Sequence, residues 1–184
     1  MGYEKTTMRK VAAKVGISPG AIFKHFENKT ALLAAKLYDD IELIQEKAIK
    51  TVPKEETVQK QFLYITECFF KYYEVRPVLS KMLVKHSLFV GGKWAEKIED
   101  QIKRLGEKIV DLISLAKKHK EIREDVDELT LATTLWSNYL FVLILLVNAP
   151  DFKASSAVEM LTPLVNQTFS GAVTGKNKKG DKKK

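Results

Sequence analysis

The chain has 184 residues and a mass of 20.9 kDa, and 45% of its residues are hydrophobic, which excludes a wholly disordered polypeptide and predicts one or at most two domains. Its 31 basic and 23 acidic residues give a formal charge of +8. Residues 1–30 carry a net charge of +4, residues 31–175 carry −1 and residues 176–184 carry +5. This distribution predicts a local anion-binding surface at one or both ends rather than a generally basic coat.

The sequence gives little indication of catalysis or metal binding. The single cysteine, Cys68, excludes an intramolecular disulfide and a cysteine-cluster zinc site, and it suits a reducing compartment. The first residues lack the apolar segment of a signal peptide, so we expect a cytoplasmic protein. No nucleophile motif, glycine-rich phosphate loop or acid pair at useful spacing is present, and we therefore expect no enzyme activity, no metal and no cofactor.

Helix-period apolar spacing interrupted by glycine and proline predicts an all-α chain without strands. We expect a small N-terminal unit over residues 1–45, a larger helical bundle over 46–174 and a disordered lysine-rich tail over 175–184. The expected helices span about 7–15, 18–25, 29–50, 55–75, 78–89, 93–120, 126–147 and 153–171.

The stretch 129–150 has no charged residue and is long enough to span a bilayer. Its first half carries five polar side chains, which are costly in lipid but easily paired inside a protein. We therefore prefer a helix covered partly by its own domain and partly by another subunit to a membrane span.

Residues 6–26 predict two short helices joined by a tight turn. Gly16 ends the first helix at a positive φ, and Ser18 with Pro19 starts the second. We expect Ile17 to enter a small core made by Val11, Val15, Ile22 and Phe26. The opposite face of the second helix is small and basic, which suits the major groove of DNA.

These residues resemble the tetracycline-repressor (TetR) family of one-component transcription regulators. The family combines a helix-turn-helix DNA-binding unit with a helical body that holds a small-molecule pocket and forms a homodimer through its last two helices. Beyond residue 45 the similarity is architectural only. The resemblance is carried by Gly2-Tyr3, Thr6-Thr7-Met8, Val11-Ala12, Val15-Gly16-Ile17-Ser18, Gly20, Lys24-His25-Phe26, Lys29 and Leu32-Leu33.

The resemblance implies a face toward double-stranded DNA and two phosphate contacts. Thr7 would cap its helix and touch a phosphate, and Lys29 would hold another phosphate without reading sequence. Lys24 could donate to guanine, and the Ala21 methyl could meet a thymine methyl. The full set of implied DNA-binding residues is Thr7, Ser18, Pro19, Gly20, Ala21, Phe23, Lys24, His25 and Lys29.

The chain departs from the family pattern in two places. Phe23 stands where members usually carry a tyrosine whose hydroxyl meets a phosphate, so we expect that hydrogen bond to be lost. Members also have a further helix before the Gly-Tyr pair, and here the chain begins at that pair, so we expect the DNA-binding unit to lack its leading helix.

The predicted function is therefore a ligand-responsive repressor that binds a palindromic operator as a homodimer. The alternatives are a helical interaction or membrane-associated protein, and a small-molecule binder with impaired DNA binding. We expect no membrane partner. Aromatic and polar side chains of the body provide candidates for the effector pocket: Phe62, Phe69, Tyr73, His86, Phe89, Trp136 and Asn138.

Overall fold

The computed structural model describes residues 5–75, 77–87, 92–149, 151 and 153–173. Within these ranges the regular secondary structure is helical, apart from one isolated antiparallel bridge between Ile122 and Val173. The all-α prediction is confirmed, and each helix begins and ends within a few residues of its expected bounds. The helices are α1 (Met8–Val15), α2 (Pro19–His25), α3 (Lys29–Thr51), α4 (Val58–Val75), α5 (Pro77–Ser87), α6 (Lys93–Lys118), α7 (Glu128–Val147) and α8 (Ala154–Ser170).

Polar side chains cap the starts of α1, α2, α3 and α7. The backbone N–H of Lys10 donates to Oγ1 of Thr7 at 3.3 Å, and the N–H of Ala31 donates to Oδ1 of Asn28 at 2.9 Å. Asp127 caps α7 in the same way, accepting from the N–H of Thr130 at 2.7 Å. Each cap satisfies a backbone donor that the first helical turn leaves without an intrahelical partner.

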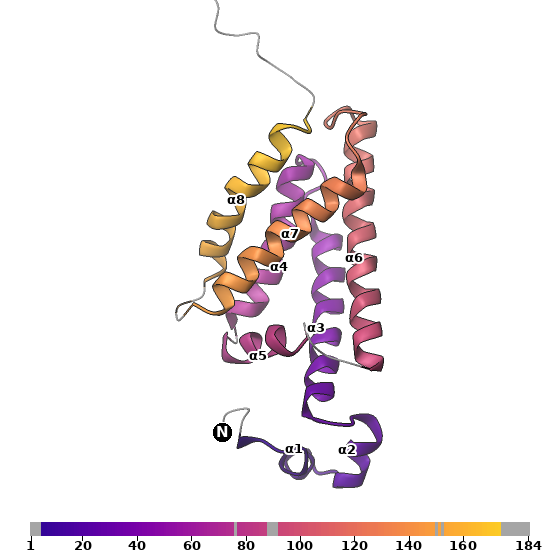
Figure 1. Cartoon of the computed structure of the whole chain (residues 1–184), viewed down its shortest axis with the longest axis vertical. Helices are drawn as coiled ribbons and strands as arrows, with labels where there is room; N and C mark the ends of the chain where they lie inside the picture. Colours follow the sequence, from indigo (N-terminus) through magenta and orange to yellow (C-terminus); the bar gives the residue numbers. More distant parts are fainter. Residues whose placement is uncertain (1–4, 76, 88–91, 150, 152, 174–184) are drawn as a thin grey trace, which may run out of the picture.

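The helices form a small head and a larger body (Figure 1). The head consists of α1, α2 and the first turn of α3, and the body contains the rest of α3 with α4 to α8. In Figure 1, α3 runs from the head into the body and lies beside α6, while α7 crosses the body in front of α4. Because α3 is one continuous helix, a tilt of α3 within the body must displace the head.

Each part has its own apolar core. The head is held by Met8, Ala12 and Ile22, with three partly buried neighbours. The body core is much larger and includes fully buried side chains such as Phe62 and Phe169. Burial of apolar side chains contributes about 1.5–3 kcal/mol for each large residue, so most of the stability comes from the body.

Candidate nucleic-acid interface and ligand cavity

The turn between α1 and α2 is set by Gly16. Its φ of 75° and ψ of 24° lie in the left-handed region, which glycine adopts without steric cost. The N–H of Ile17 reaches back to the carbonyl of Ala12 at 3.0 Å, and the N–H of Gly16 to that of Ala13 at 3.4 Å. These two bonds close α1 and direct the chain straight into α2.

Ser18 begins α2 as predicted. Its Oγ accepts from the backbone N–H of Ala21 at 3.1 Å, and Pro19 occupies the first helical position. Because this hydroxyl already serves as a cap, Ser18 fixes the amino end of α2, where free N–H groups and the helix dipole favour a phosphate.

The outer face of α2, defined by Ser18, Gly20, Ala21, Lys24 and His25, is open to solvent. Ala21 is half-buried, and the other four residues are exposed. The inner side contributes Ile22, which is 4% exposed, to the head core. No side chain of the described head covers the small, basic outer face, so a second molecule can approach it closely.

The head core differs from the prediction at two residues. Val15 is 61% exposed and Ile17 is 44% exposed, so the expectation that they belong to this core was wrong. The reason lies in how α1 is covered: the buried residues Met8 and Ala12 occupy its first turns, and Val15 stands on its last turn. Phe23 is also largely open, at 48% exposed.

Lys29 has a structural contact as well as its predicted role. Its Nζ donates to the backbone carbonyl of Thr6 at 3.1 Å and thereby ties the start of α3 to the segment that precedes α1. Thr7, beside it, is exposed and caps α1. No sequence pattern indicates the contact between Lys29 and Thr6, because it joins residues 23 positions apart.

An aromatic contact links the head to the body in addition to α3. The ring of Phe26, at the end of α2, stacks on that of Trp94 at the start of α6, with ring centroids 6.4 Å apart. Trp94 also meets the edge of Tyr38 on α3, with centroids 6.3 Å apart. The amino end of α6 therefore contacts the residue that ends α2, the helix with the open outer face.

A cavity of about 100 Å³ lies inside the body between α3, α4, α5, α6 and α7. Eight of its lining side chains are leucine, isoleucine or valine. The others are Phe69, Tyr73, Gln101, Trp136 and Tyr139.

Two of these residues, Tyr73 and Tyr139, share a hydrogen bond between their hydroxyls. Burial raises the pKa of Tyr73 to about 12 and raises that of Tyr139 well above its usual value of 10, so both phenols are neutral at physiological pH. The described lining contains no ionisable group apart from these phenols.

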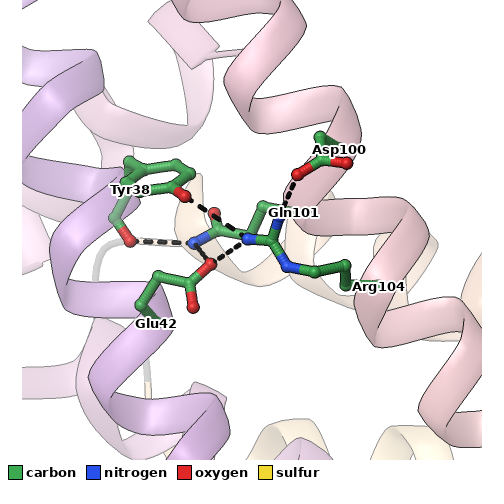
Figure 2. Close-up of polar contacts among 5 residues, drawn as sticks. All are labelled: Tyr38, Glu42, Asp100, Gln101 and Arg104. Carbon is green, nitrogen blue, oxygen red and sulfur yellow. Dashed lines mark hydrogen bonds and ion pairs between the residues drawn. The ribbon is translucent and has the colours of Figure 1, made fainter.

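A polar cluster joins α3 to α6 beside this cavity (Figure 2). The amide nitrogen of Gln101 donates to the carbonyl oxygen of Tyr38 at 2.9 Å and to Oε1 of Glu42 at 3.0 Å. The guanidinium of Arg104 pairs with Glu42 and with Asp100, and donates to the hydroxyl of Tyr38 at 3.3 Å. These partners raise the pKa of Arg104, whose hydrogen bonds to Tyr38 and Glu42 favour the charged form.

The predicted pocket residues are distributed over several places. Phe69, Tyr73 and Trp136 line the cavity, whereas Phe62 is buried in the body core outside the lining. Asn138 donates its amide to Oγ1 of Thr168 at 3.1 Å and so faces α8. The side chain of His86, and Phe89 as a whole, lie outside the described residues.

Sequence reasoning missed the contribution of α3 and α6 to the lining. Leu37 and Ile41 come from α3, and Ile98, Ile102 and Leu105 come from α6. Their spacing of three or four residues indicates that they share one helix face. The sequence pattern alone does not distinguish the wall of a cavity from ordinary core.

The carboxyl-terminal helices expose apolar side chains. Phe141, Ile144 and Leu145 on α7 are 56%, 44% and 46% exposed, and Met160 on α8 is 39% exposed. By length and composition α7 could cross a membrane, yet its inner face is buried in the body core. In the described part of the chain, no group of three or more metal-binding side chains comes together.

Comparison with known proteins found a family match over the head and more distant similarities over most of the chain. Residues 1–35 match the family model described as bacterial regulatory proteins, tetR family. Nucleoid occlusion factor SlmA of Vibrio atlanticus is 24% identical over 138 residues, a match that covers 73% of this chain and 69% of that protein.

Solved structures show the same fold at low identity. The transcriptional regulator FadR from Bacillus subtilis, in complex with stearoyl-CoA, is 14% identical with a TM-score of 0.73, and the match covers 92% of this chain and 90% of that one. FadR of Thermus thermophilus, a TetR-family repressor in complex with lauroyl-CoA, is 13% identical with a TM-score of 0.71, and the match covers 97% and 90%.

Proposed function

Because this chain belongs to the tetR family of bacterial regulatory proteins, we propose that it is a ligand-responsive transcription regulator, most simply a cytoplasmic repressor that binds a palindromic operator as a homodimer. The observation that carries this proposal is the open outer face of α2, small at Gly20 and Ala21 and cationic at Lys24. Such a face can enter the major groove, where base edges present distinct patterns.

The charges of the head support an interface with phosphates. Within residues 5–29 the described side chains include six basic residues and one acidic residue, Glu27. Lys24 is exposed on the outer face, while the ammonium of Lys29 lies at the edge of the head beside Thr6. We therefore assign base reading to Lys24 and Ala21, and phosphate contacts to Thr7, Lys29 and the amino end of α2.

The exposed apolar side chains of α7 and α8 support dimerisation through this pair of helices. Two subunits would present their reading helices about 34 Å apart, on successive major-groove faces, and so read an inverted repeat. An effector in the body cavity would act by favouring a body conformation in which this spacing is wrong.

The test is a mapped operator combined with variants of the outer face. Lys24→Ala should lose about 1–3 kcal/mol of preference for the operator over a base-substituted site, which is roughly 5- to 150-fold. Lys29→Ala should weaken binding on all sequences and lower the salt slope by about 1. Because Lys29 also holds Thr6, the fold of this variant is checked by circular dichroism.

Lys50→Ala is the matched control, because Lys50 is exposed near the far end of α3. It should retain the affinity, the base preference and the salt slope of the parent. If Lys24→Ala and Lys29→Ala bind like Lys50→Ala, the assignment of the DNA-binding face is wrong.

The similarity to SlmA favours one second candidate, a DNA-binding nucleoid occlusion factor. Both functions need the same head, so binding assays alone do not separate them. Transcript levels of genes adjoining the mapped sites do separate them: deleting the gene of a regulator changes these levels, whereas deleting that of an occlusion factor leaves them unchanged.

A further inference from the structure

We propose that the body cavity holds a small, uncharged and mainly apolar effector with one polar group, which hydrogen-bonds to the Tyr73–Tyr139 pair. This inference rests on the proposed function, because it names the chemical class of the molecule that controls DNA binding. It derives from the charge, the polar groups and the size of the cavity.

The described lining disfavours an ionised ligand. Among its described residues no lysine, arginine or histidine faces the cavity, and burial of a charge without a partner is strongly unfavourable. The nearest cation of the polar cluster, Arg104, is paired with Glu42 and Asp100. Among the described lining residues, a carboxylate or a phosphate would therefore find no counter-ion.

The polar groups of the lining suit one hydroxyl or carbonyl. Two phenols carry two donors, and the hydrogen bond between Tyr73 and Tyr139 uses one of them. The two amide protons of Gln101 are directed to Tyr38 and Glu42, which leaves its carbonyl oxygen as an acceptor. A ligand hydroxyl can thus accept from a phenol and donate to a neighbouring acceptor.

The volume of about 100 Å³ limits the ligand to one ring or a short alkyl chain. An apolar cavity of roughly 150 Å³ is known to hold benzene, so even one ring requires the lining side chains to move slightly apart. The long acyl chains bound by the two FadR structures exceed this space. The effector class therefore differs from a long-chain acyl-CoA, although the fold is shared.

The experiment titrates the full chain with matched probes and follows thermal unfolding and calorimetric binding, because a ligand that binds only the folded state raises Tm. Hexanol and hexanoate differ in charge at equal length, and p-cresol and toluene differ by one hydroxyl. We expect saturable binding of hexanol and p-cresol, at least tenfold weaker binding of hexanoate, and several-fold weaker binding of toluene than of p-cresol.

Two kinds of variant localise the probes. Tyr73→Phe and Tyr139→Phe should each reduce the affinity for p-cresol toward that for toluene and leave toluene unchanged. Leu140→Trp, which fills the cavity, should abolish the binding of both, and Val84→Phe does the same from α5 if Leu140→Trp fails to fold. Exposed Leu43→Trp on α3 is the control and should bind p-cresol like the parent.

The inference is overturned if hexanoate or stearoyl-CoA binds as tightly as hexanol, if no probe binds the folded chain, or if the filled cavity still binds p-cresol. Operator binding of the ligand-free chain is measured in parallel. A chain that binds its operator but none of the probes retains the proposed regulatory function without this effector class. A chain that binds p-cresol but no operator retains this effector class, and the proposed regulatory function is then wrong.

Discussion

At the scale of single residues, Gly20 is a position where the requirements of folding and those of DNA binding can be tested separately. A Cβ built on Gly20 meets only Oγ of Ser18, at 3.9 Å, which is an ordinary contact distance. The fold therefore accepts alanine at this position. DNA binding gives a different reason for glycine at this position. A methyl group on the outer face of α2 would lie between the helix and the floor of the major groove.

We expect Gly20→Ala to raise the free energy of unfolding by up to about 1 kcal/mol, since alanine loses less backbone entropy in a helix, and to weaken operator binding. Gly106→Ala is the matched control, because its added Cβ also lies in open space, but in α6 of the body. Denaturant titration and fluorescence anisotropy measure the two quantities. Operator affinity equal to that of the parent would show that α2 does not approach the DNA this closely.

The buried phenol of Tyr73 makes stability depend on pH in the alkaline range. Its pKa is raised to about 12, so the folded chain keeps a proton that the unfolded chain loses above pH 10. The free energy of unfolding therefore falls between pH 10 and pH 12, by on the order of 2–3 kcal/mol from this residue, and this contribution is constant below pH 10.

Urea titrations at pH 9 and pH 11.5 check this dependence. Tyr73→Phe should lose less stability between the two pH values than the parent does. Tyr64→Phe is the control, because the Tyr64 hydroxyl donates to Thr51 near the surface. An equal loss in Tyr73→Phe and in the parent would contradict the assignment.

At the scale of elements, the polar cluster fixes α3 against α6. Gln101 is 4% exposed and contacts two residues of α3, so this buried amide helps, together with Arg104, to set the register of the two helices. The same residue lines the cavity, and α3 continues into the head. Gln101 is therefore positioned to couple the cavity to the orientation of the head.

We expect Gln101→Leu to lower the free energy of unfolding by roughly 1–3 kcal/mol, because Tyr38 and Glu42 each lose a partly buried hydrogen bond. Hydrogen exchange should accelerate in the first half of α3. Glu99→Leu, at an exposed position of the same helix, is the control. Unchanged exchange in α3 would show that apolar packing alone holds the two helices together.

Whether a structural feature could be predicted from the sequence depends on how far apart along the chain the interacting residues lie. Helix starts at Thr7, Ser18 and Asn28 were predictable, because a cap acts over three residues. The exposure of Ile17 was not, because it depends on which turn of α1 is covered by neighbouring helices.

The same distinction holds for the two sites. The outer face of α2 is encoded within one short helix, so its small and basic residues could be identified in advance. The cavity is assembled from five helices, and only Phe69, Tyr73 and Trp136 were identified among its lining. Gln101 was missed because a single glutamine in an amphipathic helix looks like a surface residue until α3 is placed beside it.

At the scale of the whole molecule, α7 carries two apolar faces with different roles. Leu135, Tyr139 and Val142 lie in the body core, and Phe141 and Ile144 are exposed on another face. A membrane-spanning α7 would have to leave a core that it helps to form. Covering its exposed face by a second copy of the chain keeps that core intact and removes apolar surface from water.

Phe141→Glu tests this arrangement, because it places a charge at the centre of the expected dimer surface. We expect the variant to sediment as a monomer, to retain its helical content and to bind a single half-site like the parent. On the full palindrome its affinity should fall at least tenfold, since the two heads are no longer linked. Leu43→Glu introduces the same charge at a leucine that is 66% exposed on α3, away from α7 and α8, and should remain dimeric. If both variants sediment alike and bind the palindrome equally well, the subunits meet through another surface, and the spacing of the reading helices is set elsewhere.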